Sequence, residues 1–552
     1  MEILFWWHMS KKTVILLFII VIAGVLRLWR LGEVPISPDW DEVSLGYNAY
    51  SIMHTGRDEF GKFLPFVLRS FDDYKPALYA YLAIPSIFIF GLDTFAVRLP
   101  SAIFGILTVI ATYFLIKELF TKRLAFIVSF LLAISPWHIQ FSRIAFESNI
   151  GLAFNIFAML FFIKGLENAR LLLISSFFMG INLYVYQSEK VFTPLLLIAL
   201  IVIFRKPFFS LSKKYIVMAG ILTLCISLPI VNYTFTNRES LARARDVSIL
   251  ANATPFLGEN VDRLIRDKEN NDYLGFVLDN RRTMYAKAFV NSYLSHFDLN
   301  WLFIKGDIAR HHAPSMGLLY LLELPFLMVG LYSLLFGSFP KKIKLFIFSW
   351  FFIAPVPASI TSDVPHAVRT LNFLPTFQIF TAIGILTAIE SIRSLKIMYF
   401  KFLIVIFIFS FFIFNFLYYI NQYFVQQNYF HARYWQYGYK EIVEYLTSIH
   451  NKYNKIIVSN TMPLDQSYMF FLFYSKYSPE KYLEKGGTKS GVLKETGNKF
   501  LNFEFRPFNY YDEKEHNILL VGSQMDFNEV FKTIKRIDYP NGEVAIRVVH
   551  KD

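Results

Sequence analysis

Long apolar runs recur along the chain, and they restrict what it can fold into more than any other feature. Hydrophobic residues make up 55% of its 552 residues and charged residues only 18%, against about 25% charged residues in globular proteins. A helix needs about 20 apolar residues to cross a bilayer. So much apolar material excludes a water-soluble multidomain protein and an intrinsically disordered one, and it predicts an α-helical polytopic membrane protein.

Eleven of these runs are predicted to be transmembrane helices. They lie at about 13–31, 95–116, 124–141, 150–163, 171–187, 191–204, 215–235, 316–337, 345–360, 370–390 and 402–421. A further run at 76–91 is shorter and contains Pro85. We interpret it as a helix that lies in the outer interface. If it crossed the bilayer instead, every later segment would have the opposite orientation.

Basic residues give these helices an orientation. Every second short loop is rich in Lys and Arg, from Lys11 and Lys12 to Lys401, and cytoplasmic loops carry such an excess. The pattern predicts an integral plasma membrane protein with a cytoplasmic N-terminus and extracytoplasmic loops at 32–94 and 236–312. The net charge of +13 is then explained by anchoring in the lipid bilayer, and no nucleic-acid partner is expected.

The pattern changes near residue 423, where short mixed elements replace the apolar runs. Residues 455–459 and 517–522 read as strands, 433–451 and 465–477 as helices, and Asn541-Gly542 predicts a hairpin turn. We therefore divide the chain into a transmembrane module, residues 1–422, and a small extracytoplasmic α/β domain, residues 423–552. This domain shows no phosphate loop and no nucleophile elbow, so no catalysis is assigned to it.

Acidic residues near the ends of the predicted spans are candidates for catalysis. Asp39, Asp41 and Glu42 follow the first span closely. Neighbouring carboxylates resist joint ionisation, so a proton-accepting or metal-binding role competes with a plainer one, in which Asp39 caps a helix. In the next outer loop Arg143 and Glu147 are four residues apart, and a simple helical ion pair is the plain alternative there.

Basic side chains occupy the same predicted side of the membrane. Lys75 precedes the interfacial run, where a cation meets a lipid phosphate or extends to the interface without a specific ligand. His311 and His312 are adjacent and do not face one way on a helix, so no two-histidine metal site is expected from that pair. The remaining candidates, just before a span or in a short outer loop, are Arg310, His311, His366 and Arg369. Acids and bases at similar depth suit a substrate with a lipid tail and a phosphate head.

At these positions the sequence resembles the C superfamily of membrane glycosyltransferases, in the branch of protein O-mannosyltransferases and lipid A aminoarabinose transferases. The resemblance covers most of residues 13–390. It is carried by Asp41-Glu42, Lys75-Pro76, AVRLPSAIFGILTVIATYFLIKELF at 96–120, SRIAFESN at 142–149 and PHAVRTLNFLP at 365–375.

The resemblance implies a polyprenyl-phosphate-linked sugar as donor and an inverting, single-displacement transfer on the extracytoplasmic face. The acceptor is left open between protein, lipid and glycan. Asp41 would be the general base, with Glu42 in support and Glu147 as a further catalytic acidic residue. The expected contacts to the donor phosphate are Lys75, Arg143, Arg310, His311, His366 and Arg369. No metal ligand is assigned; a divalent metal is left open and is not expected to be obligatory.

Two other functions compete with a transferase. A transporter or lipid flippase would need internal repeats or charged residues near the membrane midplane, and no internal repeat is evident in the sequence. A non-catalytic scaffold would use its C-terminal domain to bind a partner. Substitution of Asp41 by Asn separates both from a transferase, because only a transferase loses sugar transfer through it.

Overall fold

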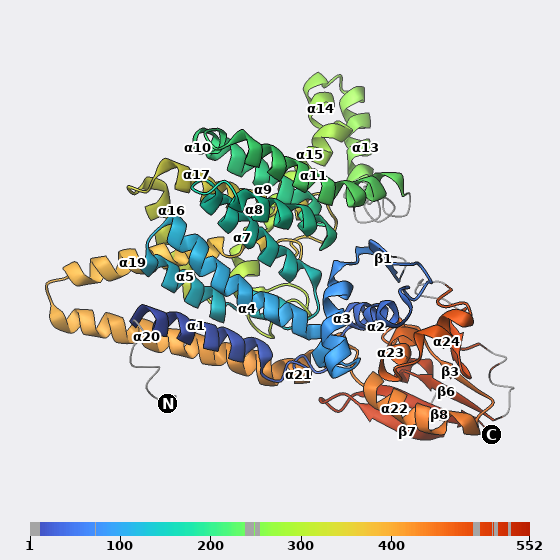
Figure 1. Ribbon diagram of the computed structural model, residues 1–552. Coiled ribbons are helices and arrows are strands. Elements are labelled where there is room, and N and C mark those ends of the chain that lie inside the picture. Colours follow the sequence, from blue (N-terminus) through green and yellow to red (C-terminus); the bar gives the residue numbers. More distant parts are fainter. Residues whose placement is uncertain are drawn as a thin grey trace. The chain divides into compact units, whose positions relative to one another are not determined.

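The computed structural model describes residues 11–71, 73–237, 248, 254–489, 497–509, 512, 517–527 and 532–551. Helix accounts for 66% of the described residues, and most strands belong to the last part of the chain, drawn orange to red in Figure 1. The chain divides into two compact units. The first comprises Met1–Ile22, Leu107–His138 and Gly151–Asn415, and the second comprises Ala23–Ile106, Ile139–Ile150 and Phe416–Asp552.

The first unit is helical in its described part. Five helices contribute residues to both units: α1 (Lys11–Leu28), α4 (Thr94–Leu119), α6 (Pro136–Ser142), α7 (Glu147–Gly165) and α20 (Met398–Asn421). The others of the first unit are α5 (Lys122–Ile134), α8 (Leu171–Ile181), η2 (Asn182–Tyr184), α9 (Glu189–Ile203), α10 (Arg205–Phe209), α11 (Lys213–Thr236), α13 (Thr254–Glu269), α14 (Tyr273–Leu278), α15 (Arg281–Ser295), η3 (Trp301–Lys305), α16 (Glu323–Phe336), α17 (Lys341–Ile353), α18 (Val356–Ser359), η4 (Leu371–Phe373) and α19 (Thr376–Ser394).

Six described helical segments are long and apolar enough to cross a membrane, as expected for an integral membrane protein. They are Thr94–Leu119, Glu147–Gly165, Lys213–Thr236, Lys341–Ser359, Leu371–Ser394 and Met398–Phe430. The pair α5 and α6, bent by 59°, makes a seventh if it is one span. Helices form at the other expected runs too, but Leu171–Tyr184 and Glu323–Phe336 are shorter. The count of eleven spans and the orientation therefore stay predictions.

Two glycines allow α16 and α19 to approach each other closely. A Cβ atom added at Gly330 would collide with the carbonyl oxygen of Phe380, and one added at Gly384 would collide with that of Phe326. Small residues at helix crossings bring backbones together and increase van der Waals contact, which drives helix association in membranes. The packing of this helix pair therefore depends on two residues without side chains.

The second unit contains the segment predicted to be the first outer loop, residues 32–94. Here α2 (Trp40–Thr55) is followed by an antiparallel pair, β1 (Val67–Ser70) and β2 (Asp73–Pro76), and by α3 (Leu78–Phe90). Helix α3 lies within the run expected to be interfacial. Its 13 residues rise about 20 Å at 1.5 Å per residue, less than the roughly 30 Å of a bilayer core. This length fits a helix that lies in the interface.

The C-terminal part of the second unit forms one mixed sheet, shown at the right of Figure 1. Its strand order is β4-β5-β3-β6-β8-β7. Strand β3 pairs in parallel with β5 and β6, and the other pairs are antiparallel. The strands are β3 (Lys455–Val458), β4 (Lys499–Phe500), β5 (Phe503–Phe505), β6 (Ile518–Gly522), β7 (Thr533–Asp538) and β8 (Val544–Lys551). The helices and turns are η5 (Gln422–Gln426), α21 (Gln427–Phe430), η6 (Ala432–Trp435), α22 (Tyr439–Ile449), η7 (His450–Lys452), α23 (Ser467–Tyr474), α24 (Pro479–Glu484) and η9 (Gln524–Asp526).

The expected strands and hairpin of this part are confirmed. Ile457 on β3, Leu520 on β6 and Val549 on β8 pack into one buried core, and the β7–β8 turn contains Gly542 at φ 86°, a conformation that glycine adopts readily. The helix expected over 433–451 is shorter, because only Tyr439–Ile449 is α-helical. The expected division of the chain at residue 422 stays a prediction.

Candidate functional site

Asp39 fixes the start of α2 and thereby the position of the acidic residues that follow. Its carboxylate accepts a hydrogen bond from the backbone N–H of Glu42 at 2.9 Å, and the Glu42 side chain accepts one from the Asp39 N–H at 3.2 Å. This reciprocal pair is a capping box, which satisfies backbone groups that a helix start leaves without partners. The plain interpretation of Asp39 as a helix cap is confirmed.

Glu42 forms a buried ion pair with Arg98. Two Arg98 nitrogens donate to its two oxygens at 2.9 Å each, and both side chains are fully buried. The backbone N–H of Ala145 adds a third bond, at 2.8 Å. Arg98 also donates to the carbonyl oxygens of Leu31, Pro35 and Ser37. Glu42 thus joins α2, α4 and the loop before α7.

Asp41, one position earlier, points toward a different partner. Its carboxylate is ion-paired with the Nζ of Lys75 on β2, and the Asp41 side chain is 25% exposed while that of Lys75 is 10% exposed. An ion pair stabilises the ionised carboxylate. Asp41 therefore combines a charged, hydrogen-bond-accepting oxygen with partial access, which a residue that removes a proton from a bound molecule needs.

Lys75 lies among carboxylates. Burial alone would lower its pKa, but the negative charges of Asp41, Glu147 and Asp73 outweigh burial and raise the pKa of Lys75. Glu147 begins α7 and is buried. The second unit therefore brings together three expected site residues, Asp41, Lys75 and Glu147, around a single ammonium group.

Arg143 does not join this group. Its guanidinium donates to the backbone carbonyl oxygens of Leu26, Arg30 and Val34 at 2.9–3.3 Å. It also lies 4.8 Å from the centre of the Phe424 ring. The side chain is fully buried and does not pair with Glu147. Arg143 thus fastens the end of α1 and the segment after it, a task for which a five-donor side chain is well suited.

In the first unit, Asp307 connects two of the expected histidines. Its Oδ2 accepts a hydrogen bond from His311 Nδ1 at 3.1 Å and one from the Ala367 N–H at 2.5 Å. The His311 and His366 ring centres lie 5.1 Å apart. In the part of the chain that the structure describes, Asp307, His311 and His366 are the one group of three metal-type ligands, with ligand atoms within 4.8 Å of one another.

These three groups have shifted pKa values. Burial lowers the pKa of His311 and, together with the Arg369 charge, lowers that of His366 further. Burial alone would raise the pKa of Asp307, but the hydrogen bond from His311 lowers it to about 2. Near pH 7 the group therefore holds neutral imidazoles and one carboxylate, and the negative charge opposes a direct contact of these histidines with a phosphate.

Arg369 is half-buried near His366. It donates to Thr361 Oγ1 at 2.6 Å and to the Ser362 carbonyl oxygen at 2.7 Å, so two of its five donor N–H groups are used by the loop that carries it. Arg310 is also half-buried, next to His311. The guanidinium group of each arginine is of a type that binds anions such as phosphate.

Sequence reasoning missed three residues that the structure brings into these clusters. Arg98, the buried partner of Glu42, lies inside an apolar run, where an isolated Arg is itself a signal of a buried partner. Asp307 lies four residues before His311, the spacing of neighbours on one helix face. His296 accepts a hydrogen bond from the His366 N–H at 3.3 Å and gave no comparable signal.

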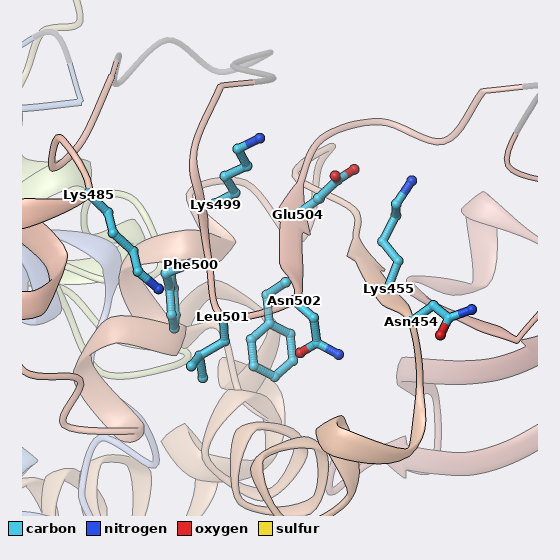
Figure 2. Close-up of a pocket in the computed structure, with 9 residues that line it drawn as sticks. Asn454, Lys455, Lys485, Lys499, Phe500, Leu501, Asn502 and Glu504 are labelled. Atoms are coloured by element: carbon cyan, nitrogen blue, oxygen red, sulfur yellow. The ribbon is translucent and has the colours of Figure 1, made fainter.

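The sheet of the second unit has a pocket of its own, of about 510 Å³. Figure 2 shows its lining, with the side chains of Lys455, Lys485 and Lys499 around it. Lys499 faces Glu504 across the β4–β5 pair, and Asn502 donates to the backbone at 2.8 and 2.9 Å. Three lysines and one glutamate suit an anionic ligand better than a neutral one. No residue of this pocket is assigned to catalysis.

The sequence model of the dolichyl-phosphate-mannose-protein mannosyltransferase family matches residues 74–231. This segment begins beside Lys75 and includes Arg98, Arg143 and Glu147. No curated protein matches the sequence significantly.

Solved structures share the fold at low sequence identity. ArnT from Cupriavidus metallidurans, in the apo state, aligns with a TM-score of 0.52 and 12% identity over 98% of both chains, and its complex with undecaprenyl phosphate gives the same TM-score at 11% identity, again over 98% of both chains. The oligosaccharyltransferase AglB from Archaeoglobus fulgidus, with an inhibitory peptide and a dolichol-phosphate, aligns with a TM-score of 0.51 and 12% identity, over 94% of this chain and 70% of that one. In another structure of that archaeal enzyme the chain spans 64% of its length.

The ArnT alignment extends over nearly the whole chain, whereas the family match begins in β2 and lies mostly in the helical part. Both comparisons agree with the resemblance inferred from the residues. The match over residues 74–231 makes this segment similar to the dolichyl-phosphate-mannose-protein mannosyltransferase family, and the solved structures show that the chain shares the fold of ArnT and AglB.

Proposed function

We propose that this protein transfers a sugar from a polyprenyl-phosphate-linked donor to an acceptor hydroxyl, with Asp41 as general base. The observation that carries the proposal is the Asp41–Lys75 ion pair, with Glu147 close enough to influence Lys75 electrostatically. Two structures of the same fold contain a polyprenyl phosphate, undecaprenyl phosphate in ArnT and dolichol-phosphate in AglB, and this supports a lipid-linked donor. A transporter or flippase is not favoured.

The proposed step is a single inverting displacement. Asp41 takes the proton of the acceptor hydroxyl while the oxygen of that hydroxyl forms a bond to the anomeric carbon. The bond between that carbon and the phosphate oxygen breaks, and polyprenyl phosphate leaves with the electron pair. A positioned base contributes typically 10²–10⁴-fold to such a step. The Lys75 cation keeps Asp41 ionised at rest, the form that a base needs.

Lys75 has a second task in this proposal, because it is the cation that meets the donor phosphate. A fixed cation stabilises the charge that develops on a phosphate leaving group. When the phosphate binds Lys75, the Asp41 carboxylate is released from its ion pair and becomes available to the acceptor hydroxyl. The negative charge of Glu147 helps to keep this ammonium group charged.

The remaining expected residues receive different tasks. Glu42 supports Asp41 by fixing α2, since both of its oxygens are used by Arg98 and backbone N–H groups. Arg143 is not retained as a phosphate contact, because its side chain is fully buried and both of its terminal nitrogens donate to backbone carbonyls. Arg310 and Arg369 keep the proposed role of phosphate contacts on the chemistry of their side chains alone. We place the reaction on the extracytoplasmic face, following the positive-inside pattern.

The experiment incubates the purified full-length protein with a panel of polyprenyl-phosphate sugars and follows release of polyprenyl phosphate by mass spectrometry. Water, peptides, lipid and glycan acceptors are offered in separate reactions, which identifies the acceptor class. Asp41→Asn should abolish release while donor binding stays within a few-fold of the native protein. Glu33→Gln, an exposed acidic residue near the end of α1, serves as the matched control and should keep full activity.

Full activity of Asp41→Asn would overturn the assignment of the base. Transport of the lipid-linked sugar across vesicles without any release of polyprenyl phosphate would favour the flippase over the transferase. Labelling of cysteines introduced at positions 41, 147 and 369 from each side of the membrane tests the orientation separately. Access only from the cytoplasmic side would contradict the proposed topology.

A further inference from the structure

The cluster of Asp307, His311 and His366 is not used by the proposed reaction. Two outer segments far apart in the sequence form it: the residues before α16 and the loop between α18 and η4. Asp307 and His311 are hydrogen-bonded at 3.1 Å, and the Ala367 N–H next to His366 donates to the same Asp307 oxygen at 2.5 Å. Two imidazoles and one carboxylate are thus gathered within 4.8 Å, measured between their ligand atoms.

One nitrogen in this cluster is left over. Nδ1 of His366 is buried and makes no hydrogen bond to any residue that the structure describes. A buried polar atom without a partner costs about 1–3 kcal/mol, so native structures rarely keep one without a reason. A metal ion bound through this nitrogen would supply the missing partner.

The surroundings hold the three side chains in place. The Ile308 N–H donates to the other oxygen of Asp307 at 2.8 Å. The His366 backbone is fixed at both ends, since its N–H donates to His296 Nε2 at 3.3 Å and its carbonyl accepts from Thr370 Oγ1 at 2.8 Å. His296 in turn donates from Nδ1 to the Ser292 carbonyl oxygen at 2.7 Å. Such outer partners fix the orientation of metal ligands and are a regular part of metal sites.

We propose that Asp307, His311 and His366 bind a divalent transition-metal ion, preferably zinc. The ion would connect the two outer segments. Imidazole nitrogen suits zinc and its transition-metal neighbours, whereas magnesium and calcium prefer oxygen ligands only. Three protein ligands leave a fourth position of a tetrahedral ion for water or another small ligand. Zinc bonds to nitrogen and oxygen are about 2.0–2.2 Å long, so small side-chain rotations close the group around an ion.

The test uses the purified full-length protein, stripped with a chelator and then titrated with zinc chloride or cobalt chloride. The native protein should bind one ion per chain by elemental analysis, and bound cobalt should show the visible absorption of a site with nitrogen and oxygen ligands. Zinc should also raise the unfolding temperature, because a ligand that binds only the folded state stabilises it. Asp307→Asn and His366→Gln should each weaken binding at least tenfold and lose this thermal shift.

His312→Gln is the matched control, because this neighbouring histidine donates to the Ala313 carbonyl oxygen at 2.7 Å and is outside the cluster. It should bind zinc as the native protein does. Absence of stoichiometric binding, or equal binding by the native protein and both cluster variants, would overturn the proposal. If one cluster variant fails to fold, the other decides. Since the titration contains no sugar donor and no sugar acceptor, its result does not depend on the proposed transferase activity.

Discussion

Asp41 and Lys75 are 34 residues apart in the sequence and form an ion pair in the structure. Asp41 lies in the first turn of α2, and Lys75 lies on the short strand β2. The pair is partly accessible, whereas the neighbouring pair of Glu42 and Arg98 is fully buried. Two consecutive acidic residues thus meet two different cations in two different environments. This difference leads us to give Asp41 the chemistry and Glu42 the positioning.

Replacement of Lys75 tests its double task. Lys75→Gln leaves the carboxylates of Asp41, Asp73 and Glu147 without their shared cation and removes the proposed phosphate contact. We expect sugar transfer to fall by about 100-fold or more and KM for the donor to rise. Steady-state kinetics with varied donor concentration measures both effects. Lys62→Gln, an exposed lysine of the same outer loop, should change neither; unchanged kinetics of Lys75→Gln would remove Lys75 from the site.

Substitution of Arg98 should lower the stability of the folded protein and not only the rate of sugar transfer. Arg98→Met leaves Glu42 buried without its cation, and removal of one partner of a buried ion pair costs about 3–5 kcal/mol. The unfolding temperature in detergent should drop clearly. Glu33→Gln, which breaks the exposed pair of Arg30 and Glu33, should cost no more than about 1 kcal/mol. Equal effects of the two variants would contradict the structural role of Arg98.

Glu59 should make stability depend on pH. Burial raises the pKa of Glu59 to about 7, although hydrogen bonds from Thr488 and Asn48 lower it in part. The folded state then binds a proton that the unfolded state has released, so the contribution of Glu59 to stability is largest below about pH 4.5, falls as the pH rises, and levels off above pH 7. The loss is on the order of 3 kcal/mol, at 1.36 kcal/mol per pKa unit.

Glu59→Gln carries no titrating group, so it should remove this part of the pH dependence and raise the unfolding temperature at pH 7.5 relative to the native protein. Unfolding temperatures measured between pH 4.5 and 8 provide the check. Glu444→Gln, on an exposed part of α22, is the control and should follow the native profile. A Glu59→Gln variant whose pH profile matches that of the native protein would refute the raised pKa.

Close packing of α16 on α19 should be sensitive to a single methyl group. Gly330→Ala places a Cβ against the Phe380 carbonyl, and overpacking of a tight contact typically costs 1–3 kcal/mol. We expect a lower unfolding temperature in detergent. A Cβ at Gly220 on α11 meets no atom within 4 Å, so Gly220→Ala should leave stability unchanged or raise it slightly through helix propensity.

Much of the local structure follows from the sequence. The apolar runs predict helices where helices occur, because a bilayer requires both apolar side chains and internally paired backbone groups. Asp39 predicts a helix cap and Asn541-Gly542 a hairpin turn, because both depend on the backbone preferences of a few neighbouring residues. The short strands β4 and β5 were missed, since two or three residues carry no recognisable alternation.

The roles of the charged residues depended on contacts between distant segments. The sequence grouped Arg143 with phosphate ligands, and the fold uses it to hold backbone carbonyls of the segment around Arg30. It assigned both His311 and His366 to the donor phosphate, and the fold brings them together around Asp307. The sequence alone determined the type of each residue, and the residue type limits which partners its side chain accepts. Which partner a side chain meets was decided by the tertiary structure. A buried charge or polar group without a partner raises the free energy of the folded state, so each one pairs with a group that the packing brings near it.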